Sequence, residues 1–453
     1  MGPYQKFRNT VAVRRRARHL RTSARAFMAT RLAPLMPTRV PPAPTAQEWA
    51  NARRQLERIL TENIAPFWYP RAMDLEYGGY RLNHDIRGEW LGAANKGLVA
   101  QAGTLWLFSA LARTPYGTAD HLEAARHGYA FLRDRLWDGD SGGFFWEVDP
   151  SGRPTKTDKH LYAQGSALYA LSEYAAAASD ATAIDLSRRL VRLIDERAHD
   201  ATHGGYVESF RRDWTPAPPN GLTYLGSEPS QKLMNTHLHL LKGMIPYYRA
   251  TNDPAARERL LELLFVQGNA VVRKTVGACT DRYRHDWTPI LDRPHDRVLF
   301  GVDMANISQL TRACNALGLP TGPFLDAFRT LFNYALRWGC DHKNGGFYEA
   351  GRLGAPADER DKPFWTQSEA LIIALEMYQL TQDPAYFQCF SKTLEWVVNH
   401  QVDWEHGEWF ERVSERGRPG GVKAGVWKTG YHSGRAALLS LELVGSLDRR
   451  ASS

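Results

Sequence analysis

The stretch DGDSGGF, residues 138–144, is one of five copies of a short motif: aspartate, three residues, glycine, glycine or glutamate, and an aromatic residue. The other copies are DLEYGGY at 74–80, DATHGGY at 200–206, DHKNGGF at 341–347 and DWEHGEW at 403–409. Glycine tolerates backbone angles that other residues avoid, so each copy predicts a tight turn that restarts a short extended segment.

The spacing of these turns indicates a repeat. Neighbouring copies start 62 or 64 residues apart, except for one gap of 141 residues, which is about two repeats long. We interpret DRYRHDW at 281–287 as a degenerate sixth copy that fills this gap. Self-similarity at a fixed period is typical of folds built from one repeated unit.

Two helical patterns lie between successive turns. They cover 96–113 and 118–136, 160–178 and 183–198, 231–250 and 255–273, 303–317 and 322–339, 365–382 and 386–401, with a last pair at 46–65 and 433–447. Because the two chain ends complete this last pair, the pattern predicts a closed all-α fold, an (α/α)6 barrel with inner and outer rings of helices. An open two-helix solenoid is the alternative, and it would require polar capping repeats.

The flanks of this barrel differ from it in composition. Residues 1–45 contain ten lysines and arginines and no acid, and they end in the proline-rich MPTRVPPAPT. We expect a disordered basic arm at 1–45, the barrel at 46–448 and a short tail at 449–453. Such an arm resembles an organellar transit peptide or a tether to an anionic surface, or it precedes a true start at Met28.

Charge and cysteine usage exclude several classes of protein. The whole chain has a net charge of +8, but acidic and basic residues nearly balance outside the arm, so no nucleic-acid surface is expected. No apolar run approaches the roughly 18 residues of a membrane helix. Four cysteines without CxxC spacing predict reduced core residues and no zinc site. We expect a cytoplasmic monomer or homodimer with no metal or other cofactor.

A pair of histidines marks the segment KLMNTHLHLLKG, residues 232–243. On a helix, residues three or four apart share a face, so Asn235, His239 and Lys242 form one polar stripe that we expect to line the central cavity. His237 falls among leucines on the other side and is predicted to pack. The two histidines therefore cannot bind one metal ion together.

The chain resembles the N-acylglucosamine 2-epimerase family over about residues 48–446. The matching segments are NKGLVAQAGTLWLFSAL (95–111), GGFFWEVDPSGRPTKTDKHLYAQGSALYALSEYA (142–175), MNTHLHLL (234–241), FWTQSEALI (364–372), DWEHGEWFERV (403–413) and WKTGYHSGRA (427–436). The resemblance implies an (α/α)6 barrel and a small sugar substrate. It also implies metal-free chemistry, in which a histidine removes the C2 proton of an open-chain aldose to give a cis-enediol(ate).

The resemblance also assigns roles to individual residues. In the family, a second histidine on the opposite face returns the proton in epimerases, whereas isomerases return it to C1, and a third histidine assists ring opening. His239 and His432 match catalytic histidines of this set. The residues that match substrate-binding positions of the family are Asn235, Trp365, Glu369, Trp427 and Arg435. Asp303 and Asn306, which lie in the altered segment described next, are also expected to contact the substrate.

Four positions depart from the family pattern. The family segment GHDIEASWLL corresponds here to GVDMANISQL (301–310), so a catalytic histidine becomes Val302 and a glutamate becomes Ala305. A family arginine becomes Gly103, and an acid becomes Lys242. Epimerisation needs proton transfer on both faces of the sugar, and valine has no ionisable group. Isomerisation needs one face and could proceed with His432.

Three functions follow as alternatives. The first is a sugar epimerase or isomerase in which His432 is the base and His239 assists ring opening. The second is a weak or silent relative that binds sugar. The third is a carbohydrate hydrolase or lyase on the same barrel, with an acid pair drawn from Asp303, Glu369 and Glu408.

Overall fold

The computed structural model describes residues 41–451, and its compact unit begins at Pro42. Most of the predicted basic arm, residues 1–40, lies outside this described part. The first helix of the described part begins directly after Thr45, whose hydroxyl accepts the backbone N–H of Glu48 while the Glu48 carboxylate accepts the N–H of Thr45. This reciprocal cap explains why the helix begins where the proline-rich segment ends.

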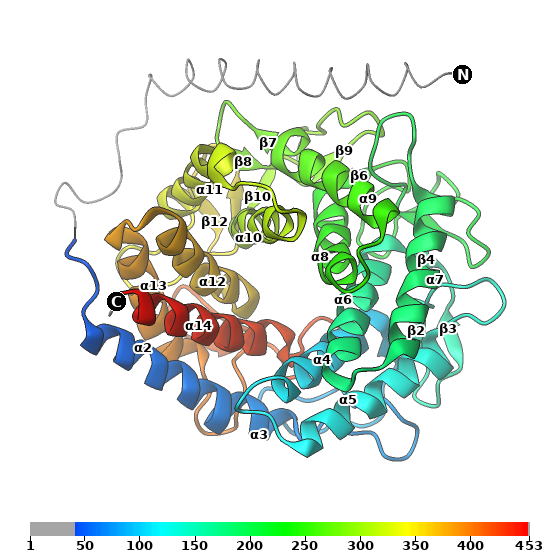
Figure 1. The fold of residues 1–453 in the computed structure, drawn as a ribbon, viewed down its shortest axis with the longest axis horizontal. Coiled ribbons are helices and arrows are strands. Elements are labelled where there is room, and N and C mark those ends of the chain that lie inside the picture. Colours follow the sequence, from blue (N-terminus) through cyan, green and yellow to red (C-terminus); the bar gives the residue numbers. More distant parts are fainter. Residues whose placement is uncertain (1–40, 452–453) are drawn as a thin grey trace. The chain divides into compact units, whose positions relative to one another are not determined.

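Within residues 41–451, twelve main helices form two concentric rings (Figure 1). The inner ring consists of α4 (Leu98–Ala112), α6 (Leu161–Ala178), α8 (Met234–Thr251), α10 (Phe300–Leu317), α12 (Phe364–Thr381) and α14 (Gly430–Ala451). The outer ring consists of α2 (Ala46–Arg58), α5 (Ala119–Phe131), α7 (Ala181–Ala198), α9 (Pro254–Phe265), α11 (Leu325–Trp338) and α13 (Pro384–Trp396).

The inner ring is closed. Each inner helix packs against the next, and α14 packs both against α4 and against the first outer helix, α2. The chain ends therefore complete one helix pair, which confirms the (α/α)6 barrel and rules out the open solenoid. Inner helices such as α12 are buried on almost every side, whereas outer helices such as α11 bury a single face.

Short irregular segments extend or connect the outer helices. Four of them are π-helical turns, η1 (Ile59–Ile64), η2 (Leu132–Leu136), η3 (Val266–Ala270) and η5 (Val397–Gln401), which follow α2, α5, α9 and α13. A 3-10 turn, η4 (Gly322–Phe324), precedes α11, and a single helical turn, α3 (Ala65–Trp68), follows η1.

Small antiparallel sheets gather at one end of the barrel. They are β1–β2–β3 (Lys96–Gly97, Glu147–Val148, Pro154–Lys156), β4–β5 (Lys159–His160, Ser209–Phe210), β6–β9 (Lys232–Leu233, Arg282–Tyr283), β7–β8 (Val272–Arg273, Ala278–Cys279), β10–β11–β12 (Arg297–Leu299, Ala350–Arg352, Ala357–Glu359) and β13–β14–β15 (Lys362–Pro363, Arg412–Val413, Pro419–Gly420). A strand directly precedes five of the six inner helices. The N-terminal turns of the inner helices therefore open toward this loop-rich end.

The aspartate of each repeated turn has two tasks. In the copy at 138–144, Oδ1 of Asp138 accepts the backbone N–H groups of Asp140 and Ser141, which shapes the turn. Its other oxygen lies 3.0 Å from Nζ of Lys159, a buried residue just before α6. The same buried pairing recurs at the other four copies, as Lys96–Asp74, Lys232–Asp200, Lys362–Asp341 and Lys423–Asp403. We call these five the turn ion pairs.

The sixth turn of the repeat lies at 273–279 and not at 281–287, where we predicted it. In RKTVGAC, residues 273–279, the N–H of Gly277 donates to the carbonyl of Arg273, as the first glycine does toward aspartate elsewhere, and Gly277 has a φ of +83°. DRYRHDW at 281–287 instead ends in a second type of turn, in which the N–H of Trp287 donates to the carbonyl of Arg284. The prediction failed because an aspartate and an aromatic residue were matched without the glycines that define the turn.

In five inner helices, α4, α6, α8, α10 and α12, the side chain of the fourth residue bonds to the backbone of a turn that precedes the helix. The side-chain oxygen of Gln164 accepts the backbone N–H of Phe144, and its amide nitrogen donates to the carbonyl of the same residue. In α8 this position is His237, whose Nε2 accepts the N–H of Tyr206 at 2.9 Å, so its predicted packing role is confirmed. In α10 it is Asp303, whose carboxylate accepts the N–H of Cys279 at 3.1 Å. Asp303 therefore has a structural role in place of the predicted substrate contact.

Several predictions from the sequence state that a feature is missing from the protein. Between residues 41 and 451 no helix combines the length and the apolar character needed to cross a membrane. No group of three or more histidine, cysteine or acidic side chains in that range is placed to hold a metal ion, and the four cysteines are free. The cytoplasmic location, the monomer or homodimer, and the lack of nucleic acid, metal and cofactor stay predictions.

The turn ion pairs generate a first prediction. Lys362 and Asp341 are 3% and 4% exposed and 2.8 Å apart, so replacing Lys362→Met strands a buried carboxylate. We expect the free energy of unfolding to fall by about 3 kcal/mol or more in urea titrations. Lys156→Met is the control, because Lys156 is 46% exposed in its pair with Glu147 and should lose about 1 kcal/mol or less. Equal losses in the two variants would contradict the proposed weight of the buried pairs.

Candidate active site

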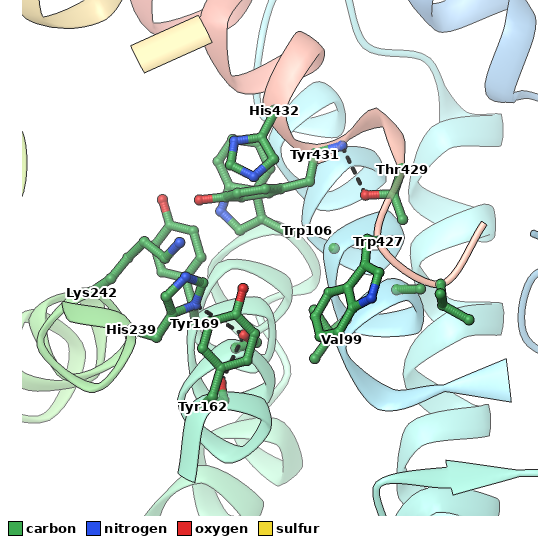
Figure 2. Close-up of a pocket in the computed structure, with 15 residues that line it drawn as sticks. Val99, Trp106, Tyr162, Tyr169, His239, Lys242, Trp427, Thr429, Tyr431 and His432 are labelled. Carbon is green, nitrogen blue, oxygen red and sulfur yellow. Dashed lines mark hydrogen bonds between the residues drawn. The ribbon is translucent and has the colours of Figure 1, made fainter. Parts of the chain in front are cut away.

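One cavity lies at the loop-rich end, among α4, α6, α8 and α14 (Figure 2). It is lined by Val99, Ala100, Ala102, Gly103, Trp106, Tyr162, Ser166, Tyr169, His239, Lys242, Val426, Trp427, Thr429, Tyr431 and His432. The sixth residue of α4, α6 and α8 contributes in each case, as Gly103, Ser166 and His239. In these three helices the equivalent spacing places this residue toward the cavity, since each helix begins directly after a short strand.

His239 reaches the cavity from α8. Its Nδ1 lies 3.1 Å from Oγ of Ser166, and its ring lies 4.0 Å from the ring of Tyr162 between centroids. Burial lowers the pKa of His239 well below its usual value, and the nearby charge of Lys242 lowers it further. The imidazole is therefore neutral at pH 7 and able to accept a proton or to donate a hydrogen bond.

His432 reaches the same cavity from the first turn of α14 (Figure 2). Its Nδ1 lies 3.7 Å from Oε1 of Glu369, and Nη1 of Arg435 donates to that same oxygen at 2.6 Å. Burial lowers the pKa of His432, although Glu369 raises it in part. The result is a neutral imidazole with a carboxylate beside one ring nitrogen, which is the arrangement of a general base.

Glu369 keeps its charge in this buried setting. Burial alone would raise its pKa, but Arg435 and His432 together lower the pKa to about 2. Glu369 is the sixth residue of α12, and Arg435 is 1% exposed on α14. Glu369 and Arg435, both predicted to bind the substrate, instead pair with each other next to His432 and are not among the residues that line the cavity.

Aromatic rings form much of the cavity wall. Trp427 is 49% exposed at the mouth, and Tyr162 lies 6.1 Å from it between ring centroids. Deeper in, Trp106 stacks on Tyr169 at 5.6 Å and meets Tyr431 edge-on at 5.1 Å. Aromatic faces at an open mouth suit the C–H faces of a sugar ring.

Three predicted contacts lie elsewhere. Trp365 is half-buried and packs on Gly301 of the neighbouring helix, where a Cβ would collide with the indole ring. Asn306 is fully buried, and its Nδ2 donates to the carbonyl of Gln267 at 3.0 Å, so it is structural. Asn235 lies one turn before His239, with its backbone N–H bound to Asp281 at 3.0 Å, and is not among the residues that line the cavity.

The acids considered for a hydrolase are not brought together. Glu408 is buried beneath α14, where it accepts from Nε1 of Trp68 at 2.5 Å and from Nζ of Lys428 at 2.6 Å. Asp303 is bonded to the turn before α10, and Glu369 to Arg435. The three carboxylates have separate structural partners, and none of them lines the cavity.

Two features of the cavity were missed in the sequence. Tyr162, Ser166 and Tyr169 follow the i, i+4, i+7 spacing of one helix face, and this signal was available in the chain. Gly103 has a role that the sequence did not reveal, because a Cβ there would lie 3.0 Å from Oγ1 of Thr429 and 3.2 Å from Cβ of Tyr431. The glycine lets α14 approach α4 and bring Tyr431 to the cavity.

The His432–Glu369 contact generates a second prediction. Because the Glu369 charge stabilises the imidazolium, Glu369→Gln should lower the pKa of His432 below its value in the unmodified protein. The pKa is measured from the pH dependence of the His432 ring signal in NMR. Glu376→Gln is the control, since Glu376 lies two turns further along α12 and pairs with Arg312. An unchanged His432 pKa in Glu369→Gln would show that the carboxylate does not act on the base.

Comparisons with known proteins show the family to which the chain belongs. A family model described as N-acylglucosamine 2-epimerase (GlcNAc 2-epimerase) matches residues 78–436. A cellobiose 2-epimerase of Bacteroides fragilis is 28% identical over 397 residues, covering 87% of this chain and 98% of that protein. A D-mannose isomerase of Marinomonas mediterranea is 25% identical over 388 residues, covering 82% and 93% respectively.

A solved structure shows the same likeness in three dimensions. It is the cellobiose 2-epimerase from Spirochaeta thermophila, which superimposes with a TM-score of 0.80 at 31% identity, covering 88% of this chain and 98% of that one. The family model spans most of the sequence, including α4 through the first turns of α14. The chain therefore belongs to the N-acylglucosamine 2-epimerase family.

Proposed function

We propose that this protein is a carbohydrate isomerase that acts on an open-chain aldose, with aldose–ketose isomerisation favoured over 2-epimerisation. The observation that carries the proposal is a neutral His432 at the cavity with the Glu369 carboxylate 3.7 Å from its Nδ1. The proposal is further supported by relatives named cellobiose 2-epimerase and D-mannose isomerase.

The first step is removal of the C2 proton. His432 takes the proton and becomes an imidazolium, which the adjacent Glu369 stabilises by charge. Arg435 holds the Glu369 carboxylate in position through a 2.6 Å hydrogen bond. A positioned general base of this kind accelerates a reaction by roughly 10²–10⁴-fold. The electrons of the C2–H bond become the enediolate, whose negative charge is shared by O1 and O2.

The second step decides between the two reactions. Returning the proton to C1 on the same face, while the O2 hydroxyl proton passes to O1, gives a ketose, and His432 is then the only group that must transfer a proton to or from carbon. Returning it to C2 on the opposite face gives the epimer and requires a second donor, and on α10 the family histidine is replaced by Val302. His239, with Nδ1 held by Ser166, is proposed to assist ring opening.

Proton exchange in deuterium oxide tests the proposal. We expect purified protein, incubated with mannose, glucose and cellobiose, to form a ketose that carries deuterium at C1. N-acetylmannosamine is included because it has an amide at C2 in place of a hydroxyl and can report only 2-epimerisation. His432→Ala should slow this exchange by about 10²-fold or more, since it removes the base. His342→Ala is the control, because His342 is exposed in the turn at 341–347. Exchange that survives His432→Ala would rule out His432 as the base.

The same experiment separates the alternatives. Deuterium at C2 of an epimerised aldose would indicate that a second donor acts on the opposite face. Binding of an aldose without deuterium in any product would favour the silent sugar-binding relative.

A gain-of-function variant tests the role of α10. Val302→His with Ala305→Glu should raise the ratio of epimer to ketose, because it returns an imidazole and a carboxylate to the helix that lacks them. The products are quantified by chromatography. Val302→Gln with Ala305→Glu is the matched control, since glutamine is polar but carries no transferable proton near pH 7. An equal ratio in both variants would mean that position 302 does not face the sugar.

A further inference from the structure

Lys242 places a cation in the cavity without a counter-charge from the protein. It is 8% exposed, and within residues 41–451 its Nζ has no hydrogen bond or ion pair. The ammonium instead lies 4.8 Å from the ring centroid of Tyr431 and 5.6 Å from that of Tyr169. Aromatic faces stabilise a cation only in part, so a buried lysine in this setting favours an anion nearby.

The rest of the cavity cannot supply that anion. Its fifteen lining residues include two histidines and Lys242 but no aspartate or glutamate. The nearest acid is Glu369, and Arg435 already binds it at 2.6 Å. The charge of Lys242 is therefore unbalanced unless a ligand brings its own negative group.

We propose that the substrate is an aldose with an anionic substituent, a carboxylate or a phosphate, which pairs with Lys242 inside the cavity. The inference rests on the proposed function, because it names the substrate class of the same site. A charge-assisted hydrogen bond in a partly desolvated cavity gives both affinity and a fixed orientation for the sugar. Uronic acids and sugar phosphates share this chemistry.

The other charged and titratable groups around Lys242 do not change charge near neutral pH. Glu369 stays ionised and Arg435 stays protonated, while His239 and His432 are neutral because burial lowers their pKa values. Burial also raises the pKa values of Tyr162, Tyr169 and Tyr431, so these phenols stay protonated. Burial and the charge of Arg435 lower the pKa of Lys242 to about 7, whereas Glu369 acts in the opposite direction.

Because Lys242 titrates near pH 7 and the other groups around it do not, the affinity for an anion should depend on pH. Below pH 7 the lysine is charged and binds the anion directly. Above pH 7 the lysine must first take up a proton, so affinity for an acidic sugar should fall by about tenfold for each pH unit. Affinity for a neutral sugar has no such requirement and should stay level between pH 7 and 9.

Calorimetric titration of the full chain provides the test. Glucuronate and glucose 6-phosphate are compared with glucose, and mannuronate and mannose 6-phosphate with mannose. We expect the acidic member of at least one pair to bind about 10–100-fold more tightly, the range of a hydrogen bond to a charged group. Comparing the uronate with the phosphate identifies which anionic group the cavity accepts.

Variants test whether Lys242 is the residue that causes the preference for the acidic sugar. Lys242→Met keeps the length of the side chain and should abolish the preference for the acidic sugar over its neutral partner. Lys242→Arg should retain the preference. Lys343→Met, in the exposed part of the turn at 341–347, should match the unmodified protein. Because the pH profile uses the unmodified protein, the test does not depend on any variant folding.

Two results would overturn the inference. One is equal binding of acidic and neutral sugars, and the other is a Lys242→Met variant that still prefers the acidic sugar. Deuterium exchange into neutral aldoses with no preference for acidic ones would overturn this inference alone. Absence of both exchange and binding for every sugar tested would overturn the proposed function as well.

Discussion

The buried ion pairs between turn aspartates and the lysines before the inner helices set the geometry of the whole barrel. Four of the five pairs join the turn after an outer helix to a lysine directly before the next inner helix, and the fifth, Lys423–Asp403, lies in the loop before α14. Burying a lysine and a carboxylate is favourable only when both are closely paired, so the starts of α4, α6, α8 and α12 are tightly specified. Once the start is fixed, helical periodicity decides which residue faces the axis. The positions of His239 and Glu369 therefore follow from the turn ion pair that precedes each of their helices.

The repeated turns explain why the fold could be predicted well from the sequence. The glycines of the repeat are required by backbone conformation, and the turns they make are visible as letters in the chain. The unit at 273–279 escaped detection because Arg273 replaces aspartate and Cys279 replaces the aromatic residue, so that only Gly277 is left of the motif. The turn lysines were missed because a lysine in sequence is usually a surface residue, and burial is a property of the folded unit.

The site was harder to predict than the fold. Periodicity correctly separated His237 from His239, because the two residues differ in direction on one helix. It could not separate Asp303 and Asn306 from substrate contacts, since an acid or amide near a cavity and one bonded to a turn look alike in sequence. Trp365 likewise matched a family position, yet the packing partner Gly301 comes from a neighbouring helix. Contacts between inner helices depend on the closed ring, which no local pattern encodes.

The pairing of α2 with α14 has a consequence for the folding of the protein. The two helices stand at opposite ends of the described residues, so the contacts that close the ring, α14 with α2 and α14 with α4, join segments that are far apart in the sequence. Contacts of this kind close long loops, which costs conformational entropy and slows folding. Because α14 also carries His432 and Arg435, we expect this side of the cavity to form only when the ring closes.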